Sequence, residues 1–268
     1  ADRATAKFEE TRKAVQAFIG ANEAEEIIFT KGTSESINLV ASSWGRKFLN
    51  EGDEVLISTM EHHSNIVPWQ MICKERGATL KVMPINEAGE IILEEVEKLL
   101  SEKTKMVAVN HASNTLGTIN PIEKLAKMAH AVGAKILVDG AQSTSHLEVN
   151  VKDLNVDFFA SSAHKMYGPT GLGFLYGKRG ILEKMPPYQG GGEMIKDVSF
   201  TETTYNDIPY KFEAGTPSIA DVIAFKQAID FINELGKENI AAYEQELLAY
   251  GTAQLMQIDR VRIIGTAK

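Results

Sequence analysis

Short apolar runs alternate along this chain with longer segments of helical periodicity, and this alternation restricts the possible folds most strongly. Seven runs predict strands, at residues 27–29, 55–58, 79–83, 106–110, 135–139, 158–161 and 173–176. Helical patterns lie between them at residues 34–49, 66–76, 93–100 and 122–132. Such alternation is typical of an α/β fold with a mostly parallel, doubly wound sheet. Functional residues are then expected at the carboxyl ends of the strands.

The sequence changes in character after about residue 186. Three glycines at 190–192 and a polar stretch at 196–207 predict a long loop, and loops of that length usually serve a site or an interface. Two helices are predicted at 218–235 and 237–257, with a break at Gly236. We therefore predict a large domain over residues 1–235 and the start of a smaller carboxyl-terminal α/β domain over 236–268. The chain begins without Met inside a helical pattern and stops in a strand-like run at 261–268, so we expect a fragment or a partly ordered polypeptide.

Composition excludes several classes of protein. With 268 residues the chain can bury a large core, and a net charge of −8 argues against a nucleic-acid partner. No apolar run approaches the ~20 residues that span a bilayer, and residues 2–17 are too charged for a secretory signal, so we expect a cytoplasmic protein.

The single cysteine, Cys73, excludes an internal disulfide. Because its helical pattern places it beside Trp69 and Ile72, we predict that it packs in the core and is not a nucleophile.

The first predicted strand leads into a turn that could hold a phosphate. Thr33 and Ser34 open the following helix, where backbone N–H groups and two hydroxyls converge at the positive end of the helix dipole. Taken alone, these residues are more typical of an ordinary helix cap.

Three further strand ends carry polar side chains. His62 could stack on a flat heteroaromatic ring or transfer protons near neutral pH, although adjacent histidines more often lie in a solvated loop. A shared metal ion is not expected there, because adjacent side chains cannot easily bind one ion. Asn114 lies in a segment that ordinary turn chemistry would also explain. Asp139 ends an otherwise apolar strand and needs a partner, either a structural salt bridge or a ligand that Gln142 could also reach.

The strand at 158–161 is followed by Ser162, His164 and Lys165. A lysine amine attacks a carbonyl only when it is unprotonated, and an exposed lysine in a turn is the ordinary alternative. Five strand ends that all carry polar groups are nevertheless hard to attribute to coincidence. A lysine for a Schiff base and an acid, Asp139, for a pyridine nitrogen are what pyridoxal 5′-phosphate (PLP) requires. We therefore predict a PLP site.

Six motifs carry a resemblance to a known family. They are TKGTSESINLVA (30–41), MEHHSNIVPWQ (60–70), SNTLGT (113–118), VDGAQS (138–143), SSAHKMYGPTG (161–171) and FEAGTP (212–217). Together they resemble the SufS-like cysteine desulfurases within the class V aminotransferases, over nearly the whole chain. The resemblance implies a fold type I PLP enzyme with a seven-stranded sheet between helices. It also implies conversion of L-cysteine to L-alanine, with transfer of the sulfur to an enzyme persulfide for iron–sulfur cluster assembly. Selenocysteine is a possible second substrate, and a sulfur-acceptor protein is an expected partner.

The resemblance assigns roles around the cofactor ring. Lys165 would form the Schiff base and shuttle the substrate's α proton, and Asp139 would pair with the pyridinium nitrogen. Gln142 would bond the phenolic oxygen, and His62 would stack on the ring and assist catalysis. Asn114 would contact the substrate carboxylate or a cofactor oxygen.

The phosphate contacts implied by the resemblance come from two subunits. Thr33, Ser34, Ser162 and His164 would bind the phosphate from one chain, and Thr216 would reach it from the other. A homodimer is therefore implied.

The sequence also departs from the family pattern. The family's sulfur-accepting cysteine and its substrate-binding arginine belong to a carboxyl-terminal portion that these residues do not include, and Cys73 does not match that cysteine. Two alternatives remain open: another class V aminotransferase or lyase reaction, and a catalytically incomplete PLP-fold binding protein.

Overall fold

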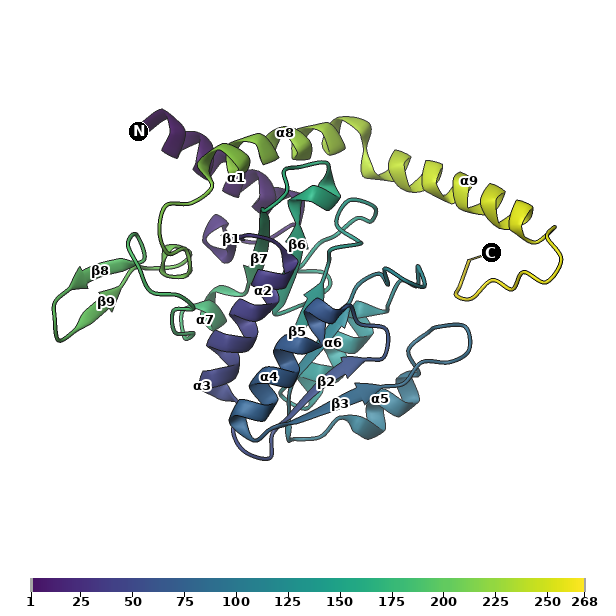
Figure 1. Cartoon of the computed structure of the whole chain (residues 1–268), viewed down its shortest axis with the longest axis horizontal. Helices are drawn as coiled ribbons and strands as arrows, with labels where there is room; N and C mark the ends of the chain where they lie inside the picture. Colours follow the sequence, from purple (N-terminus) through teal and green to yellow (C-terminus); the bar gives the residue numbers. More distant parts are fainter. Residues whose placement is uncertain (1, 268) are drawn as a thin grey trace.

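The computed structural model describes residues 2–267, and their central feature is a seven-stranded sheet (Figure 1). Its order is β1-β7-β6-β5-β4-β2-β3. The strands are β1 (Ile27–Thr30), β2 (Glu54–Ser58), β3 (Thr79–Met83), β4 (Thr104–Asn110), β5 (Lys135–Asp139), β6 (Phe158–Ser162) and β7 (Gly173–Gly177). Only the pairings made by β7 are antiparallel in this sheet. All seven predicted strands and the mostly parallel sheet are confirmed.

Helices cover both faces of the sheet, as the alternating pattern predicted. One face packs against α1 (Asp2–Phe18), α5 (Leu93–Leu99), α6 (Ile122–Ala131) and α8 (Ile219–Leu235). The other packs against α2 (Thr33–Leu39), α4 (Val67–Arg76) and α7 (Arg179–Leu182). Successive residues of β5 point to opposite faces, so Ile136 and Val138 join the first core and Leu137 joins the second. The fold therefore has three layers.

Two segments before residue 236 differ from the prediction. The helix predicted at 34–49 is interrupted, because a π-helical turn (Val40–Gly45) separates α2 from α3 (Arg46–Phe48). At this turn the chain packs closely on α4, where a Cβ on Gly45 would lie 2.7 Å from Ile72 Cγ1. The loop predicted at 196–207 is instead a hairpin of β8 (Ile195–Val198) and β9 (Thr203–Tyr205), which projects from the body of the molecule (Figure 1). Its side chains are mostly exposed, so no core-facing pattern revealed it.

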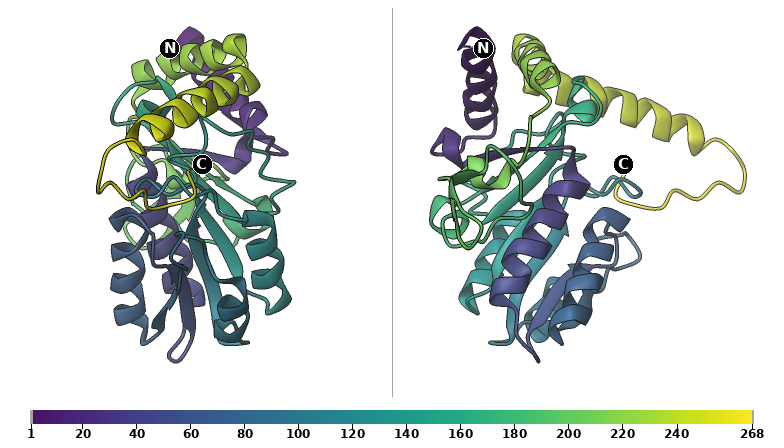
Figure 2. Two further views of the ribbon diagram at one scale, coloured as in Figure 1. Left: turned by 90° about the vertical axis from the view of Figure 1, so that its right-hand side faces the viewer. Right: turned by 60° about the vertical axis from the view of Figure 1, so that its left-hand side comes forward.

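The two terminal regions pack differently. The first helix, α1, lies against α8, whereas α9 (Lys237–Leu255) extends away from the sheet (Figure 2). Of the residues in α9 only Lys237 is buried. The strand predicted at 261–268 is wrong for residues 261–267, which form no strand, and Lys268 lies outside the described residues. We propose that residue 236 begins a second, smaller domain, and the exposure of α9 supports this boundary.

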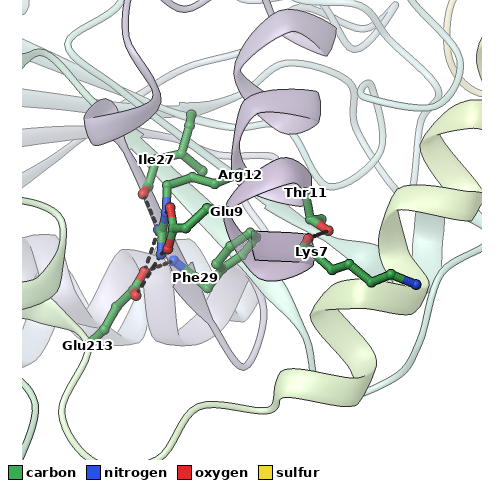
Figure 3. A network of polar contacts seen from close by, with 7 residues as sticks. All are labelled: Lys7, Glu9, Thr11, Arg12, Ile27, Phe29 and Glu213. Carbon is green, nitrogen blue, oxygen red and sulfur yellow. Dashed lines mark hydrogen bonds and ion pairs between the residues drawn. The ribbon is translucent and has the colours of Figure 1, made fainter. Parts of the chain in front are cut away.

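A buried guanidinium joins α1 to β1 and to the segment before α8 (Figure 3). Arg12 is 1% exposed and makes a bidentate contact with Glu213, at 2.7 and 3.0 Å. It also donates to the Ile27 carbonyl oxygen at 2.7 Å, while Phe29 N donates to Glu213 Oε1 at 2.7 Å. Each partner of the ion pair thus also satisfies a backbone group of β1, so this network holds three distant parts of the chain together.

Within residues 2–267, none of the helices combines the length and the apolar character that crossing a bilayer requires.

Candidate active site

A cavity of about 250 Å³ opens where five strands end. It is lined by Thr33, Ser34, His62, Ser64, Asn110, Ala112, Asn114, Asp139, Ala141, Gln142, Ser162, His164 and Lys165. Nine of the ten predicted site residues are among them. They meet because the carboxyl ends of parallel strands reach the same edge of a sheet. The tenth, Thr216, is exposed and lines a different cavity of about 460 Å³, beside Thr30 and Lys31.

A buried carboxylate and a lysine amine face this cavity together. Asp139 is 5% exposed, and its Oδ1 accepts a hydrogen bond of 2.9 Å from Ala141 N. Burial raises the pKa of Asp139, while the Ala141 hydrogen bond and the charges of Lys165 and His62 act in the opposite direction. Lys165 is half-buried. An incoming cationic N–H group would stabilise the Asp139 carboxylate by offsetting its desolvation.

One side of the cavity carries the hydroxyls of Thr33 and Ser162. Thr33 N donates to Ser162 Oγ at 2.9 Å, and the Thr33 and Ser162 hydroxyls lie 2.8 Å apart. This contact depends on two glycines. Gly32 has a φ of 147°, and a Cβ on Gly173 would lie 2.5 Å from Gly32 Cα. The hydroxyls thus gather where α2 begins and the helix dipole favours an anion.

A chain of hydrogen bonds connects this side to His62. Ser34 Oγ donates to Ser64 Oγ at 2.9 Å, and Ser64 Oγ lies 2.7 Å from His62 Nδ1. Ser64 N also donates to His62 Nδ1, at 3.2 Å. Nδ1 is therefore the acceptor nitrogen, and the neutral ring carries its proton on Nε2. The exposed imidazole lines the cavity and is held through one nitrogen, and the His63 ring lies 5.8 Å from it at an interplanar angle of 47°.

These residues fit PLP. The hydroxyls at the start of α2 suit its phosphate, the buried Asp139 suits a protonated ring nitrogen, and Lys165 suits its aldehyde. Gln142 and Asn114 line the same cavity, where they could bond the oxygens of a ligand.

Sequence reasoning missed one buried acid, Glu61, which is 8% exposed. It accepts hydrogen bonds from Ser58 Oγ at 2.5 Å, Asn65 Nδ2 at 2.7 Å and Asn110 N at 3.1 Å. Burial raises the pKa of Glu61 to about 7, because together with the nearby Asp139 charge it outweighs the hydrogen bonds. Like Asp139, Glu61 closely follows an apolar strand, and that signal could have identified it.

This raised pKa makes the folding stability depend on pH. Glu61 binds its proton more tightly in the folded than in the unfolded chain, so its contribution is complete below pH 4.5 and is lost as the pH rises to about 7. In Glu61→Gln that loss is absent. Urea unfolding at pH 5 and pH 8 should show that the stability advantage of the wild type over the variant falls by about 3 kcal/mol. If the wild type exceeds the variant in unfolding free energy by the same amount at both pH values, the pKa of Glu61 is not raised in the folded protein.

Cys73 is buried in the core, as predicted. It is 4% exposed, in the same apolar cluster as Trp69 and Ile72. Burial raises the pKa of Cys73 to about 11, so little thiolate forms near neutral pH. Its environment is that of a packing residue.

Comparisons with known proteins agree with the fold and the motifs. A "Probable cysteine desulfurase" of Mycolicibacterium paratuberculosis is 51% identical over 268 residues, which is 100% of this chain and 39% of that protein. One of Halalkalibacterium halodurans is 51% identical over 265 residues, 99% of this chain and 65% of that protein. The solved structure of a cysteine desulfurase from Thermococcus onnurineus has a TM-score of 0.95 and 41% identity, and the match covers 99% of this chain and 66% of that one.

The chain thus spans between 39 and 66% of the length of these relatives. The family model "Aminotransferase class-V" matches residues 1–268. The resemblance seen in the six motifs is confirmed, and the chain belongs to the class V aminotransferase family.

Proposed function

We propose that this chain forms the cofactor-binding part of a PLP-dependent cysteine desulfurase. The observation that carries the proposal is that buried Asp139 and Lys165 line one cavity together with Thr33 and Ser162, whose hydroxyls lie 2.8 Å apart. The relatives that are about 50% identical and carry the name cysteine desulfurase support the choice of reaction within the class V family.

Each residue around the cavity has a proposed task in holding PLP. Thr33, Ser34, Ser162 and His164 would bind the phosphate. Asp139 would keep the ring nitrogen protonated, Gln142 would bond the phenolic oxygen, and His62 would stack on the ring. Lys165 Nζ would hold the aldehyde carbon. When bound, PLP supplies an electron sink for the bonding pair released at the α carbon of an amino acid.

Proton transfer at that α carbon is the task we assign to Lys165. A general base must lie within hydrogen-bond reach of the proton that it takes, and Lys165 Nζ faces the cavity where the amino acid would bind. Asn114 is proposed to contact the substrate carboxylate or a cofactor oxygen from the same rim. A cation opposite Asp139 would counteract the effect of burial and keep this carboxylate ionised.

The sulfur step needs a thiolate. It would attack the substrate Sγ, so that an S–S bond forms, the Cβ–S bond breaks, and Cβ receives the electron pair and a proton to give alanine. Cys73 is unsuited to this task because it is buried and its pKa is raised to about 11. We therefore assign the step to a cysteine outside these 268 residues.

The proposed assembly is a homodimer in which Thr216 reaches the phosphate site of the second chain. The exposure of Thr216, outside the cavity of its own chain, supports this arrangement. A sulfur-acceptor protein and a role in iron–sulfur cluster assembly complete the proposal.

An assay of products tests the proposed reaction. Full-length protein incubated with L-cysteine and a thiol reductant should release alanine and sulfide in equal amounts. Transfer of an amino group to a keto acid without sulfide would instead indicate another class V reaction.

Replacement of Cys73 separates a packing role from a chemical one. Cys73→Ser in the full-length protein should leave the rate of alanine formation within about twofold of the wild type, because the side chain lies in the core and away from the cavity. The variant should be less stable than the wild type, because a hydroxyl replaces an apolar thiol in a packed site. A fall of alanine formation to background in a folded variant would show that Cys73 takes part in the chemistry.

A further inference from the structure

The carboxylate of Glu61 connects three segments at the rim of the cavity. Ser58 is the last residue of β2, Asn65 belongs to the turn that carries His62, and Asn110 is the last residue of β4. All three donate hydrogen bonds to Glu61, two of them to Oε1 and one to Oε2. Both oxygens of the ionised carboxylate therefore act as acceptors.

Two of these donors have fixed orientations. Asn65 Oδ1 accepts from Trp69 Nε1 at 2.9 Å, so its Nδ2 must face Glu61. The donor on Asn110 is its backbone N–H, which cannot turn into an acceptor. Asn65 and Trp69 are both fully buried, so no solvent replaces a lost partner. At each of these two contacts only an acceptor at position 61 completes the network.

His62 follows Glu61 directly in the chain and occupies the cap position of the short 3₁₀ turn His63–Asn65. Its ring is restrained at Nδ1 by Ser64, and Asn65 N donates to the His62 carbonyl oxygen at 2.8 Å. The backbone on either side of His62 is thus held by Glu61 and by the turn that Glu61 binds.

We propose that Glu61 is a positioning residue that fixes the His62 turn against the end of β4 and so holds the His62 ring where a planar cofactor can stack on it. This inference rests on the proposed PLP site. It adds a residue that touches neither cofactor nor substrate and acts through His62.

The donor pattern defines a variant and its rescue. Glu61→Gln puts an amide N–H opposite either Asn65 Nδ2 or Asn110 N, whichever way the amide is turned, so one contact is lost. Adding Asn65→Asp removes the conflict, because an aspartate at 65 can accept from both the new glutamine and Trp69 Nε1. Glu123→Gln, on the exposed side of α6, is the matched control for the same chemical change.

Hydrogen exchange of the apoprotein tests the positioning directly. The amides of Ser64, Asn65 and Ile66, which are bonded within the turn, should exchange at least tenfold faster in Glu61→Gln. The exchange of these amides should return to the wild-type rate in the double variant Glu61→Gln/Asn65→Asp. It should stay at the wild-type rate in the control variant Glu123→Gln. Unchanged exchange in Glu61→Gln would overturn the inference.

A double-mutant cycle on PLP affinity shows whether Glu61 acts through His62. Aromatic stacking accounts for up to about tenfold in affinity, so His62→Ala and Glu61→Gln should each weaken PLP binding by up to that factor, as followed by absorbance. The double variant should bind no more weakly than His62→Ala alone. If the double variant instead shows the product of the two single losses in PLP affinity, the inference is overturned. If the wild-type apoprotein fails to bind PLP, the proposed function fails, while the exchange result still decides the positioning of the turn.

Discussion

Lys165→Ala in the full-length protein is expected to lose cysteine desulfuration almost completely. The structure places Lys165 and buried Asp139 in the lining of one cavity, where we propose that the lysine amine holds PLP and moves the α proton of the substrate. Loss of a general base alone lowers kcat by about 10²–10⁴-fold. The variant should still bind PLP through the contacts proposed for its phosphate. Alanine formation under saturating cysteine measures the first effect, and an absorbance titration with PLP measures the second.

Lys124→Ala is a suitable control, because Lys124 is exposed on α6 and away from the cavity. It should leave both measurements unchanged. Desulfuration by Lys165→Ala at the rate of the wild type would refute the assignment of Lys165.

Arg12→Met is expected to lower the free energy of unfolding by about 3–5 kcal/mol. The guanidinium is 1% exposed, and its removal leaves Glu213 as a largely buried carboxylate without its main counter-charge. The Ile27 carbonyl would also lose a hydrogen bond of 2.7 Å. Chemical denaturation followed by circular dichroism measures the change, which is large relative to the usual stability of a single domain.

Arg46→Met provides the comparison, because Arg46 pairs with Glu75 on the surface, where the two side chains are 58% and 47% exposed. Exposed pairs contribute at most about 1 kcal/mol, so this variant should change little. If Arg12→Met and Arg46→Met lower the free energy of unfolding by the same small amount, the Arg12–Glu213 network does not hold α1 and the segment before α8 in place.

The sheet could be predicted from the sequence because its strands are short apolar runs separated by helical segments, and burial on both faces enforces that pattern. The hairpin of β8 and β9 could not, because these strands pair only with each other and expose most of their side chains. The π-helical turn at 40–45 was missed for another reason. It lies where Gly45 packs against Ile72, a tertiary contact that helical periodicity does not encode.

The candidate site was largely predictable for a topological reason. Parallel strands deliver the residues that follow them to one edge, so nine of the ten predicted residues line one cavity. Glu61 was not predicted, because beside two histidines it resembles a residue of a solvated turn. Its burial depends on Asn110, which is 49 positions away, and on Trp69, which orients Asn65. The place of Thr216 outside the cavity follows from packing and could not be read from its motif alone.

Chemical trapping of the cofactor on the full-length protein tests the central claim most directly. The protein would be incubated with PLP, reduced with borohydride and digested, and the peptides analysed by mass spectrometry. The account predicts a phosphopyridoxyl group on the peptide that contains Lys165 and its absence in Lys165→Ala. A phosphopyridoxyl group on another lysine, or on no lysine at all, would contradict it.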